Sequence, residues 1–405
     1  GEPVNDWYGH GTHVGGIAAG ADNLTSLSGN ALAHWFWGLA PDATIINLKV
    51  LDQNGVGKDS NVIAALNRAV QLKSKYNIRV INLSLGRPVT ASYKIDPLCQ
   101  AVEAAWKAGI VVVVSAGNYG RDNSSGNNGY GTITAPGNDP YVITVGAVND
   151  KSDTDRTNDV IATYSSKGPT AIDHIVKPDL VAPGNRIISY QSGGSNMVKN
   201  YPANRPDVDY YFPSATSAPS PHFFQLSGTS MAAPVVTGIV AELLAKTPSL
   251  TPDQVKARLM RTAWRGFPSV MSTYDPSTGQ TYTANADIFT IGAGMVDAWA
   301  AYNDSTSVTG AAPSPLAYWD SISKRPKLTL NSIGANTIVW GTTIVWGTSI
   351  VWGTNVSGNS VVWGTSLVWG ASAVQGFSVI WGTTSPWADS TMSGESLPIG
   401  IYGEN

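Results

Sequence analysis

Three short segments of the 405-residue sequence carry side chains that could do chemistry together. They are GHGTHVGG (9–16) with His10, VVVVSAGN (111–118) with Asn118, and LSGTSMAAPVVTG (226–238) with Ser230. A serine becomes a nucleophile when a neighbouring base takes its proton, and histidine is a common base. The residue types therefore predict a nucleophile, a general base and an amide donor, if the fold brings the three segments together.

The surroundings of Ser230 favour this chemistry. Ser230 follows a Gly-Thr turn and stands at the start of an apolar helix predicted over 228–246. The N–H groups at a helix start are unpaired, and the helix dipole favours negative charge there. A tetrahedral oxyanion needs such donors. Asn118 ends a buried strand, so its amide is expected to point into the crevice.

The elements that must position these side chains alternate between strands and helices. Apolar runs predict strands at 44–51, 79–86, 110–118 and 141–148, and periodicity with capping signals predicts helices at 61–75, 96–109, 228–246 and 251–262. Strands that are apolar on both faces and separated by helices indicate a parallel sheet covered on both sides. The sequence therefore predicts a three-layer α/β fold with a mostly parallel sheet, in which ligands bind beyond the carboxyl ends of the strands.

The motifs resemble those of the subtilisin-like serine proteases, the subtilases. Eight segments follow the family's chain order over most of residues 5–302: KVLDQNGVG (49–57), INLSLG (81–86), SAGN (115–118), APGNDPYVITVGAV (135–148), YSSKGP (164–169), PDLVAPG (178–184), SGTSMAAP (227–234) and GAGMVDAWAA (292–301). The resemblance implies a serine endopeptidase that acts on proteins and peptides through an acyl-enzyme and needs no cofactor for its chemistry.

The resemblance also implies residue roles. Ser230 would be the nucleophile, His10 the general base, and Asn118 the oxyanion donor beside the N–H of Ser230. Ser84, Leu85 and Gly86 would form an edge that pairs with the substrate peptide as an added strand. Ala116 and Gly117 would line the wall of the primary specificity pocket. Arg87 stands where the family often has Gly, so no cleavage preference is carried over.

The family's catalytic aspartate has no match. The family places it well before the histidine, in Asp-Ser-Gly or Asp-Thr-Gly, and neither tripeptide occurs in this sequence. Asp6 lies four residues before His10, where the family has a variable loop residue. We therefore expect an N-terminally incomplete chain that is weak or inactive as it stands. Loss of this aspartate alone lowers kcat about 3 × 10⁴-fold in subtilisin.

The composition changes after residue 302. Residues 303–330 read as a linker between a peptidase domain at 1–302 and an extension at 331–405. The extension has Trp at 340, 346, 352, 363, 369, 381 and 387, mostly followed by Gly. A short regular period predicts stacked all-β repeats. These repeats could be structural, or could contact a glycan or cell surface. The alternative function is a non-catalytic surface or binding protein that presents the Trp repeat on a crippled protease fold.

Composition excludes some partners and locations. The net charge is −3, with 13% charged residues, which gives no reason to expect nucleic acid. One cysteine, Cys99, excludes an internal disulfide framework. We expect no membrane-spanning segment, because no apolar run is long enough, and the family resemblance implies a secreted or cell-surface protein. Structural calcium is possible, its ligands are unknown, and Asp207 and Asp209 read more simply as solvated loop carboxylates.

Overall fold

The computed structural model describes most of residues 5–320 and short segments beyond. The described ranges are 5–21, 36–124, 126–211, 217–275, 278–320, 325–329, 391–393 and 403–404. The Trp repeat lies outside them, as does most of the loop after the first helix. The all-β extension therefore stays a prediction.

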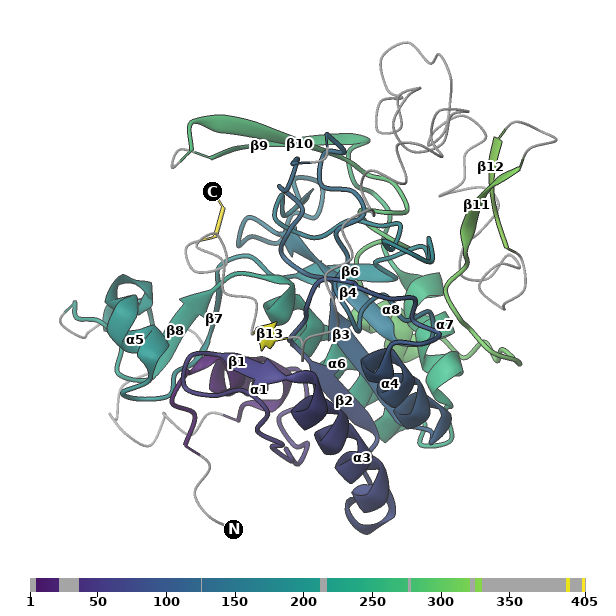
Figure 1. Ribbon diagram of the computed structural model, residues 1–405. Coiled ribbons are helices and arrows are strands. Elements are labelled where there is room, and N and C mark those ends of the chain that lie inside the picture. Colours follow the sequence, from purple (N-terminus) through teal and green to yellow (C-terminus); the bar gives the residue numbers. More distant parts are fainter. Residues whose placement is uncertain are drawn as a thin grey trace.

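A parallel sheet forms the centre of the molecule (Figure 1). Its strands are β2 (Val80–Leu83), β3 (Val111–Ser115), β4 (Ile143–Asn149) and β6 (Leu180–Pro183), in that spatial order, and β5 (Val160–Ile161) pairs antiparallel with the end of β4. Every residue of β3 and β4 is buried, so both faces are covered. The expected α/β fold with a parallel sheet is confirmed.

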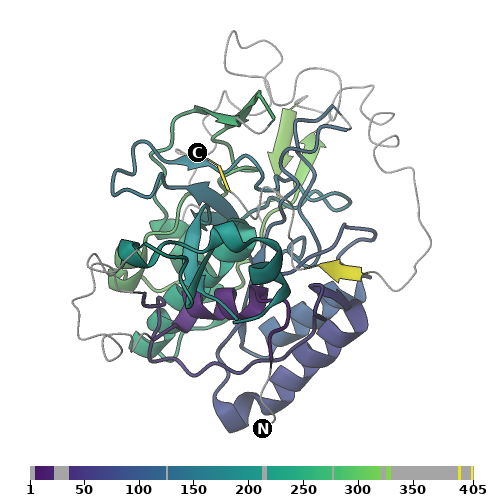
Figure 2. The same ribbon diagram turned by 90° about the vertical axis from the view of Figure 1, so that its left-hand side faces the viewer.

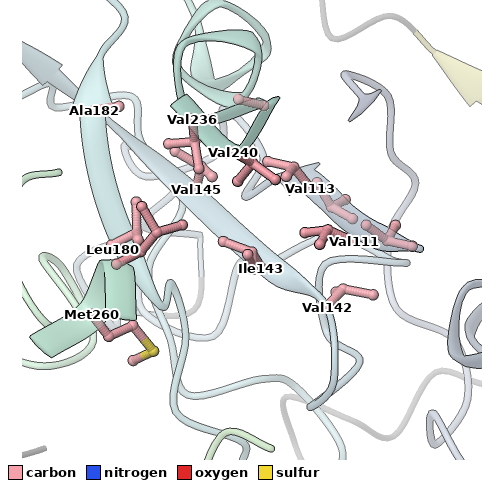
Figure 3. Close-up of a cluster of buried hydrophobic side chains, with 14 of the residues drawn as sticks. Val111, Val113, Val142, Ile143, Val145, Leu180, Ala182, Val236, Val240 and Met260 are labelled. Carbon is pink, nitrogen blue, oxygen red and sulfur yellow. The ribbon is translucent and has the colours of Figure 1, made fainter. Parts of the chain in front are cut away.

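Helices pack on both faces of the sheet. Helix α6 (Thr229–Lys246) lies on one face and contacts β2, β3, β4 and β6. Helix α1 (His10–Ala19) packs against α6. Elsewhere α4 (Pro97–Lys107) packs against β3, and α3 (Asp59–Tyr76) against α4. Figure 3 shows Val236 and Val240 of α6 above the strands, while Met260 of α7 (Pro252–Thr262) lies below Leu180.

Local signals fix the ends of three helices. Asp96 caps α4 by accepting from the N–H of Leu98, and Gly109, with φ +82°, follows its end. Thr251 and Gln254 form the capping box expected at the start of α7. Asp297 caps α8 (Ala298–Asn303) through the N–H of Ala300. The predicted helix end at Gly109 and the predicted capping box of α7 are confirmed, while the caps formed by Asp96 and Asp297 are additional findings.

The strand predicted at 44–51 is wrong. Residues 44–50 have no regular structure, and Leu51 forms only an isolated bridge to Gly57. Ile45, Ile46 and Leu48 are exposed. A strand needs a hydrogen-bonded neighbour, and no backbone–backbone bond joins 44–50 to another described segment. The apolar run therefore forms no strand with the described part of the chain.

The Ser-, Pro- and Tyr-rich stretch 189–225 is partly ordered into elements. Its ends form the antiparallel pair β7 (Ile187–Tyr190) and β8 (Phe223–Leu226), and α5 (Asn196–Asn200) and two short 3-10 turns lie between them. Phe36, Tyr211 and Phe223 pack ring against ring beside this pair. Because β7 contacts α1, this ribbon supports the helix that begins with His10.

The segment expected to be a linker packs on the domain over its first half. Val308, Ala312 and Ala317 are buried in the main core. The strands β11 (Ala317–Asp320) and β12 (Arg325–Leu328) then form an antiparallel pair, as β9 (Val270–Asp275) and β10 (Gln280–Asn285) do earlier in the chain. The domain boundary at residue 302 stays a prediction, but residues 304–317 do not behave as a free linker.

Helix α6 reaches a length and mean hydropathy that would suffice to cross a membrane, contrary to the sequence expectation. Most of its residues are buried inside the domain. It is the core helix against which the sheet packs.

Candidate active site

Ser230 lies at the start of α6, in a turn held on two sides. The preceding Gly228 has φ +147°, and its N–H donates to Gly184 O at 2.8 Å. Ser84 Oγ donates to Ser230 O at 2.8 Å, which ties the end of β2 to the turn. Ser230 is 1% exposed, and its Oγ lies 3.5 Å from Ser84 O. The serine is therefore buried at a helix N-terminus beside the β2 edge.

His10 is the first residue of α1. Gly9, with φ +105°, precedes it, and a Cβ there would lie 2.6 Å from Ser195 Oγ, so only glycine fits. Asp6 holds this start by accepting from Gly9 N (2.8 Å), Thr12 N (2.7 Å) and Thr12 Oγ1 (2.8 Å). The Nε2 atom of His10 is buried and has no hydrogen-bond partner in the described part of the chain.

Helix α1, which begins with His10, packs against helix α6, which carries Ser230 in its first turn. Val14 and Ile17 share a cluster with Met231. Further along, a Cβ on Gly238 would lie 2.8 Å from Ala18 O. This order is the one expected of two helices that run in the same direction, with His10 and Ser230 at their N-termini.

Asn118 is joined to the same turn. Its Oδ1 accepts from Thr229 N at 2.9 Å and Thr229 Oγ1 at 3.1 Å. Its Nδ2 lies 3.1 Å from where a Cβ on Gly228 would sit. Thr229 Oγ1 also accepts from Gly117 N at 3.1 Å. Thr229 therefore fixes both the strand end and the orientation of the Asn118 amide, a role that the sequence analysis did not assign.

The five expected substrate-binding residues fall at two strand ends around this turn. Ser84, Leu85 and Gly86 follow β2, and Ala116 and Gly117 follow β3. Ser84 contacts Ser230 directly, and Gly117 contacts Thr229. The structure therefore brings these two strand ends to the Ser230 turn, while substrate binding by these residues stays a prediction.

Arg87 supports the β2 edge from behind. Its side chain is buried, with Nη2 2.7 Å from Asp96 Oδ2 and Nε 2.8 Å from Asp59 Oδ2. Its backbone exchanges two hydrogen bonds with Ala135. The guanidinium is thus committed to buried ion pairs and places a structural cation beside the edge.

The two histidines of α1 differ in their contacts. His13 Nε2 donates to Ile187 O (3.1 Å) and Phe224 O (3.0 Å), which ties α1 to β7 and β8, as expected for a structural histidine. Burial lowers the pKa of His13 to about 3. Burial also lowers the pKa of His10 to about 4, against the opposing effect of the Asp6 carboxylate. At neutral pH His10 is therefore an uncharged imidazole that can accept a proton.

The described residues contain no cluster of three or more His, Cys, Asp or Glu side chains suited to a metal ion. Asp207 forms an isolated backbone bridge to Pro219. Cys99 is buried, its thiol donates to Asn138 Oδ1, and burial raises its pKa well above the ordinary value.

The amino-acid sequence is similar to those of known serine proteases. The chain is 38% identical to serine protease AprX of Bacillus subtilis (strain 168), over 64% of this chain and 53% of the relative. It is 34% identical to subtilisin DY of Bacillus licheniformis, over 65% of this chain and 73% of the relative. The chain spans about half the length of several curated relatives that it matches, AprX among them.

The fold comparison agrees with these relatives. The solved structure of sphericase matches 72% of this chain and 78% of its own, with a TM-score of 0.52 at 26% identity. Residues 1–317 match the Subtilase family, Peptidase_S8. A match over this share of the 405 residues, together with the parallel sheet and the turn at Ser230, shows that the chain belongs to the subtilase family of serine peptidases.

Proposed function

We propose that the protein is a serine endopeptidase with Ser230 as nucleophile, His10 as general base and Asn118 as oxyanion donor. The observation that carries the proposal is the Asn118–Thr229 hydrogen bond, which aims the Asn118 amide at the turn holding Ser230. Family membership over residues 1–317 supports the reaction class. The substrate class is protein or peptide.

In this mechanism Ser230 Oγ attacks the peptide carbonyl while His10 Nε2 takes its proton. The same nitrogen then gives the proton to the leaving amine, and water hydrolyses the acyl-enzyme. The developing oxyanion accepts from Asn118 Nδ2 and from the N–H of Ser230, at the positive end of the α6 dipole. The low pKa of His10 keeps this base unprotonated at neutral pH.

The rate of this mechanism depends on a group that orients the His10 ring. Among the described residues no carboxylate hydrogen-bonds to the His10 ring. The two carboxylate oxygens of Asp6 accept hydrogen bonds from Gly9 and Thr12 instead. Asp6 thus holds the helix start and acts on His10 only through its charge. We therefore expect slow turnover from these 405 residues alone, because an orienting carboxylate fixes the histidine tautomer and stabilises the imidazolium.

A fluorophosphonate probe tests the nucleophile without requiring fast turnover. The intact chain should be labelled at Ser230, located by mass spectrometry, and His10→Ala should slow the labelling. Ser305→Ala is the control, because it removes an exposed hydroxyl that we do not assign to the catalytic or binding site. Labelling that survives Ser230→Ala would contradict the proposal, and a complete lack of labelling would favour the non-catalytic surface or binding role.

Other features of the proposed role rest on family likeness. We propose peptide binding along Ser84, Leu85 and Gly86, with Ala116 and Gly117 lining the primary pocket. We also propose secretion or display at the cell surface, by likeness to the subtilisins among the relatives. Structural calcium, and glycan or surface contact through the Trp repeat, are retained as proposals.

A further inference from the structure

A glutamate from the far end of the sequence is bound inside the peptidase domain. Glu404 is 4% exposed. Its Oε1 accepts from the N–H of Thr163 at 2.9 Å, from the hydroxyl of Thr163, and from Arg121 Nη2 at 2.9 Å. Three donors converge on one carboxylate oxygen, which is how proteins bind an acidic side chain.

The main chain of Glu404 is recognised as well. Its N–H donates to Asn185 Oδ1 at 2.8 Å, and its carbonyl accepts from Asn185 Nδ2 at 2.9 Å. One asparagine side chain thus satisfies both backbone groups of the residue, as a neighbouring strand would. Asn185 is 3% exposed and Thr163 4%, so the binding groups are part of the folded domain.

Contacts within the domain hold Arg121 in place. Its Nη1 lies 2.5 Å from Asp275 Oδ2, its Nε donates to Thr163 Oγ1 at 2.6 Å, and its guanidinium stacks 3.9 Å from the Tyr282 ring centre. An arginine held on three sides loses little freedom when it binds a carboxylate, which favours affinity. The Arg121 guanidinium pairs with both Asp275 and Glu404. The two donors of Thr163 therefore help to stabilise the Glu404 carboxylate.

The site also selects the residue before the glutamate. Gly403 has φ +74°, and a Cβ there would collide with Ser227 Oγ and lie 2.8 Å from Arg186 Cγ. Only glycine fits this conformation and this close approach. Ser227 stands three residues before Ser230 in the same turn. The bound Gly-Glu dipeptide therefore lies directly against the segment that carries the proposed nucleophile.

A second part of the same tail lies at another border of the candidate site. Residues 391–393 form β13 (Thr391–Ser393), which pairs antiparallel with β1 (Val56–Lys58) (Figures 1 and 2). Just before β1, Gly55 packs on the Tyr8 ring, whose centre is 6.3 Å from that of His10. β1 therefore borders the His10 side, and residues 403–404 border the Ser230 side.

We propose that Arg121, Thr163 and Asn185 form a peptide-binding subsite specific for a Gly-Glu sequence, which this chain's own Gly403 and Glu404 occupy in competition with acidic peptides from outside. The chemical class of the ligand is a peptide with glycine followed by glutamate. The contacts of the glutamate carboxylate supply the charge specificity, and the glycine supplies the steric specificity. The subsite is independent of whether Ser230 is catalytic.

Binding of a labelled peptide to the full chain tests this proposal. The probe is a fluorescein-labelled, C-terminally amidated peptide with the sequence of residues 396–405, SLPIGIYGEN. Amidation leaves the glutamate side chain as the only carboxylate of the peptide itself, and the carboxylate of the dye is common to all probes. All chains carry Ser230→Ala, which prevents cleavage, so failure of the peptidase mechanism would not affect the measurement. Fluorescence anisotropy reports binding.

The chain with Glu404→Ala should bind the probe, while the chain with native Glu404 should bind it at least about tenfold more weakly, because its own tail fills the subsite. On the Glu404→Ala chain, probes with Gln for Glu or Ala for Gly should bind at least about tenfold more weakly, as expected when a buried charged hydrogen bond or a required glycine is lost. Glu395→Ala, which makes the same charge change in the same segment, is the matched control and should behave like the native chain.

Two further variants separate binding from folding. Thr163→Val and Arg121→Gln, each combined with Glu404→Ala, should weaken binding of the probe and leave the circular dichroism spectrum unchanged. If Arg121→Gln unfolds the chain, the nearly isosteric Thr163→Val decides the test alone. Equal binding of the Glu and Gln probes would overturn the proposal. So would equal binding by native and Glu404→Ala chains, or no binding by the Glu404→Ala chain.

Discussion

Asn118 shows how one side chain is divided between structure and proposed chemistry. Its carbonyl oxygen is committed to Thr229, and this contact orients the amide nitrogen toward Gly228 and the start of α6. An asparagine amide has distinct donor and acceptor ends, so a bond to one end aims the other. The strand end and the helix start are therefore locked together by the residue that we propose to bind the oxyanion.

Asn118→Asp separates these two roles. Aspartate keeps an oxygen for Thr229 and removes the amide donor, so the fold should persist while kcat falls by about 10²–10³, the usual effect of losing one oxyanion donor. KM should change little, because the lost contact acts mainly in the transition state. Steady-state kinetics on a peptide ester, with melting temperature as a control, measures this. Unchanged kcat in a folded variant would remove Asn118 from the mechanism.

The buried histidines of α1 make stability depend on pH. The folded pKa values of His10 and His13, about 4 and about 3, lie below the unfolded value near 6.5. Between these values the unfolded chain binds more protons than the folded one, so the free energy of unfolding rises with pH. Stability is therefore fully present above pH 6.5 and is lost as the pH falls toward 4 and 3.

We expect His13→Gln to weaken this acid sensitivity. Each depressed histidine contributes a slope of up to about 1.36 kcal/mol per pH unit. Urea unfolding of the Ser230→Ala chain between pH 7 and pH 5 should show a smaller loss of stability when His13 is glutamine. The exposed His222 is the control, and His222→Gln should leave the slope as it is. An identical slope in all three chains would show that the α1 histidines are not the source.

At the scale of elements, the strength of each sequence prediction followed from whether its cause was local. The end of α4 and the capping box of α7 depend on residues within one turn, and the sequence was enough to predict both. The strand at 44–51 depends on a neighbour elsewhere in the chain, which an apolar run does not reveal. The sequence predicts roles for His10, Asn118 and Ser230 because each stands in a distinctive motif. The contact of Thr229 with Asn118 is not predictable in this way, because the two residues lie 111 positions apart, and the Arg87 ion pair depends on how α3 and α4 pack.

Arg87 connects the elements around the β2 edge. It joins Asp59, at the start of α3, to Asp96, the cap of α4, and its backbone pairs with Ala135. Asp96 is fully buried and Asp59 is mostly buried. Removal of the arginine would leave a buried carboxylate without its counter-charge, which is costly.

Arg87→Leu should therefore lower the free energy of unfolding by about 3–5 kcal/mol. The matched control is Arg156→Leu, which breaks the ion pair between Arg156 and Asp297 at the surface and should cost less than about 1 kcal/mol. Chemical denaturation of both variants gives the comparison. Similar small losses in both would mean that Asp96 is stabilised by its capping contacts without the arginine.

At the scale of the whole molecule, a buried polar network joins three distant segments. Lys177 and Lys256 both pair with Asp179, at 2.7 and 3.1 Å, and burial lowers the pKa of Lys177. Ser314 Oγ donates to Asp179 Oδ1 at 2.5 Å and accepts from Lys256 Nζ at 2.9 Å. The network unites the strand β6, the helix α7 and the segment that composition alone assigned to a linker.

If residues 304–317 are part of the peptidase domain, a change at Ser314 must be felt by the whole fold. Ser314→Ala removes a hydrogen bond to a buried carboxylate and one from a buried ammonium, so it should lower the free energy of unfolding by about 1–3 kcal/mol. Ser305→Ala, in the exposed part of the same segment, should have no measurable effect. Both are measured by urea unfolding in the Ser230→Ala background. If Ser314→Ala lowers the stability of the single cooperative unfolding transition, the domain extends to about residue 317, where the family match also ends. If it does not, the boundary at residue 302 holds, because a linker contributes nothing to the stability of the core.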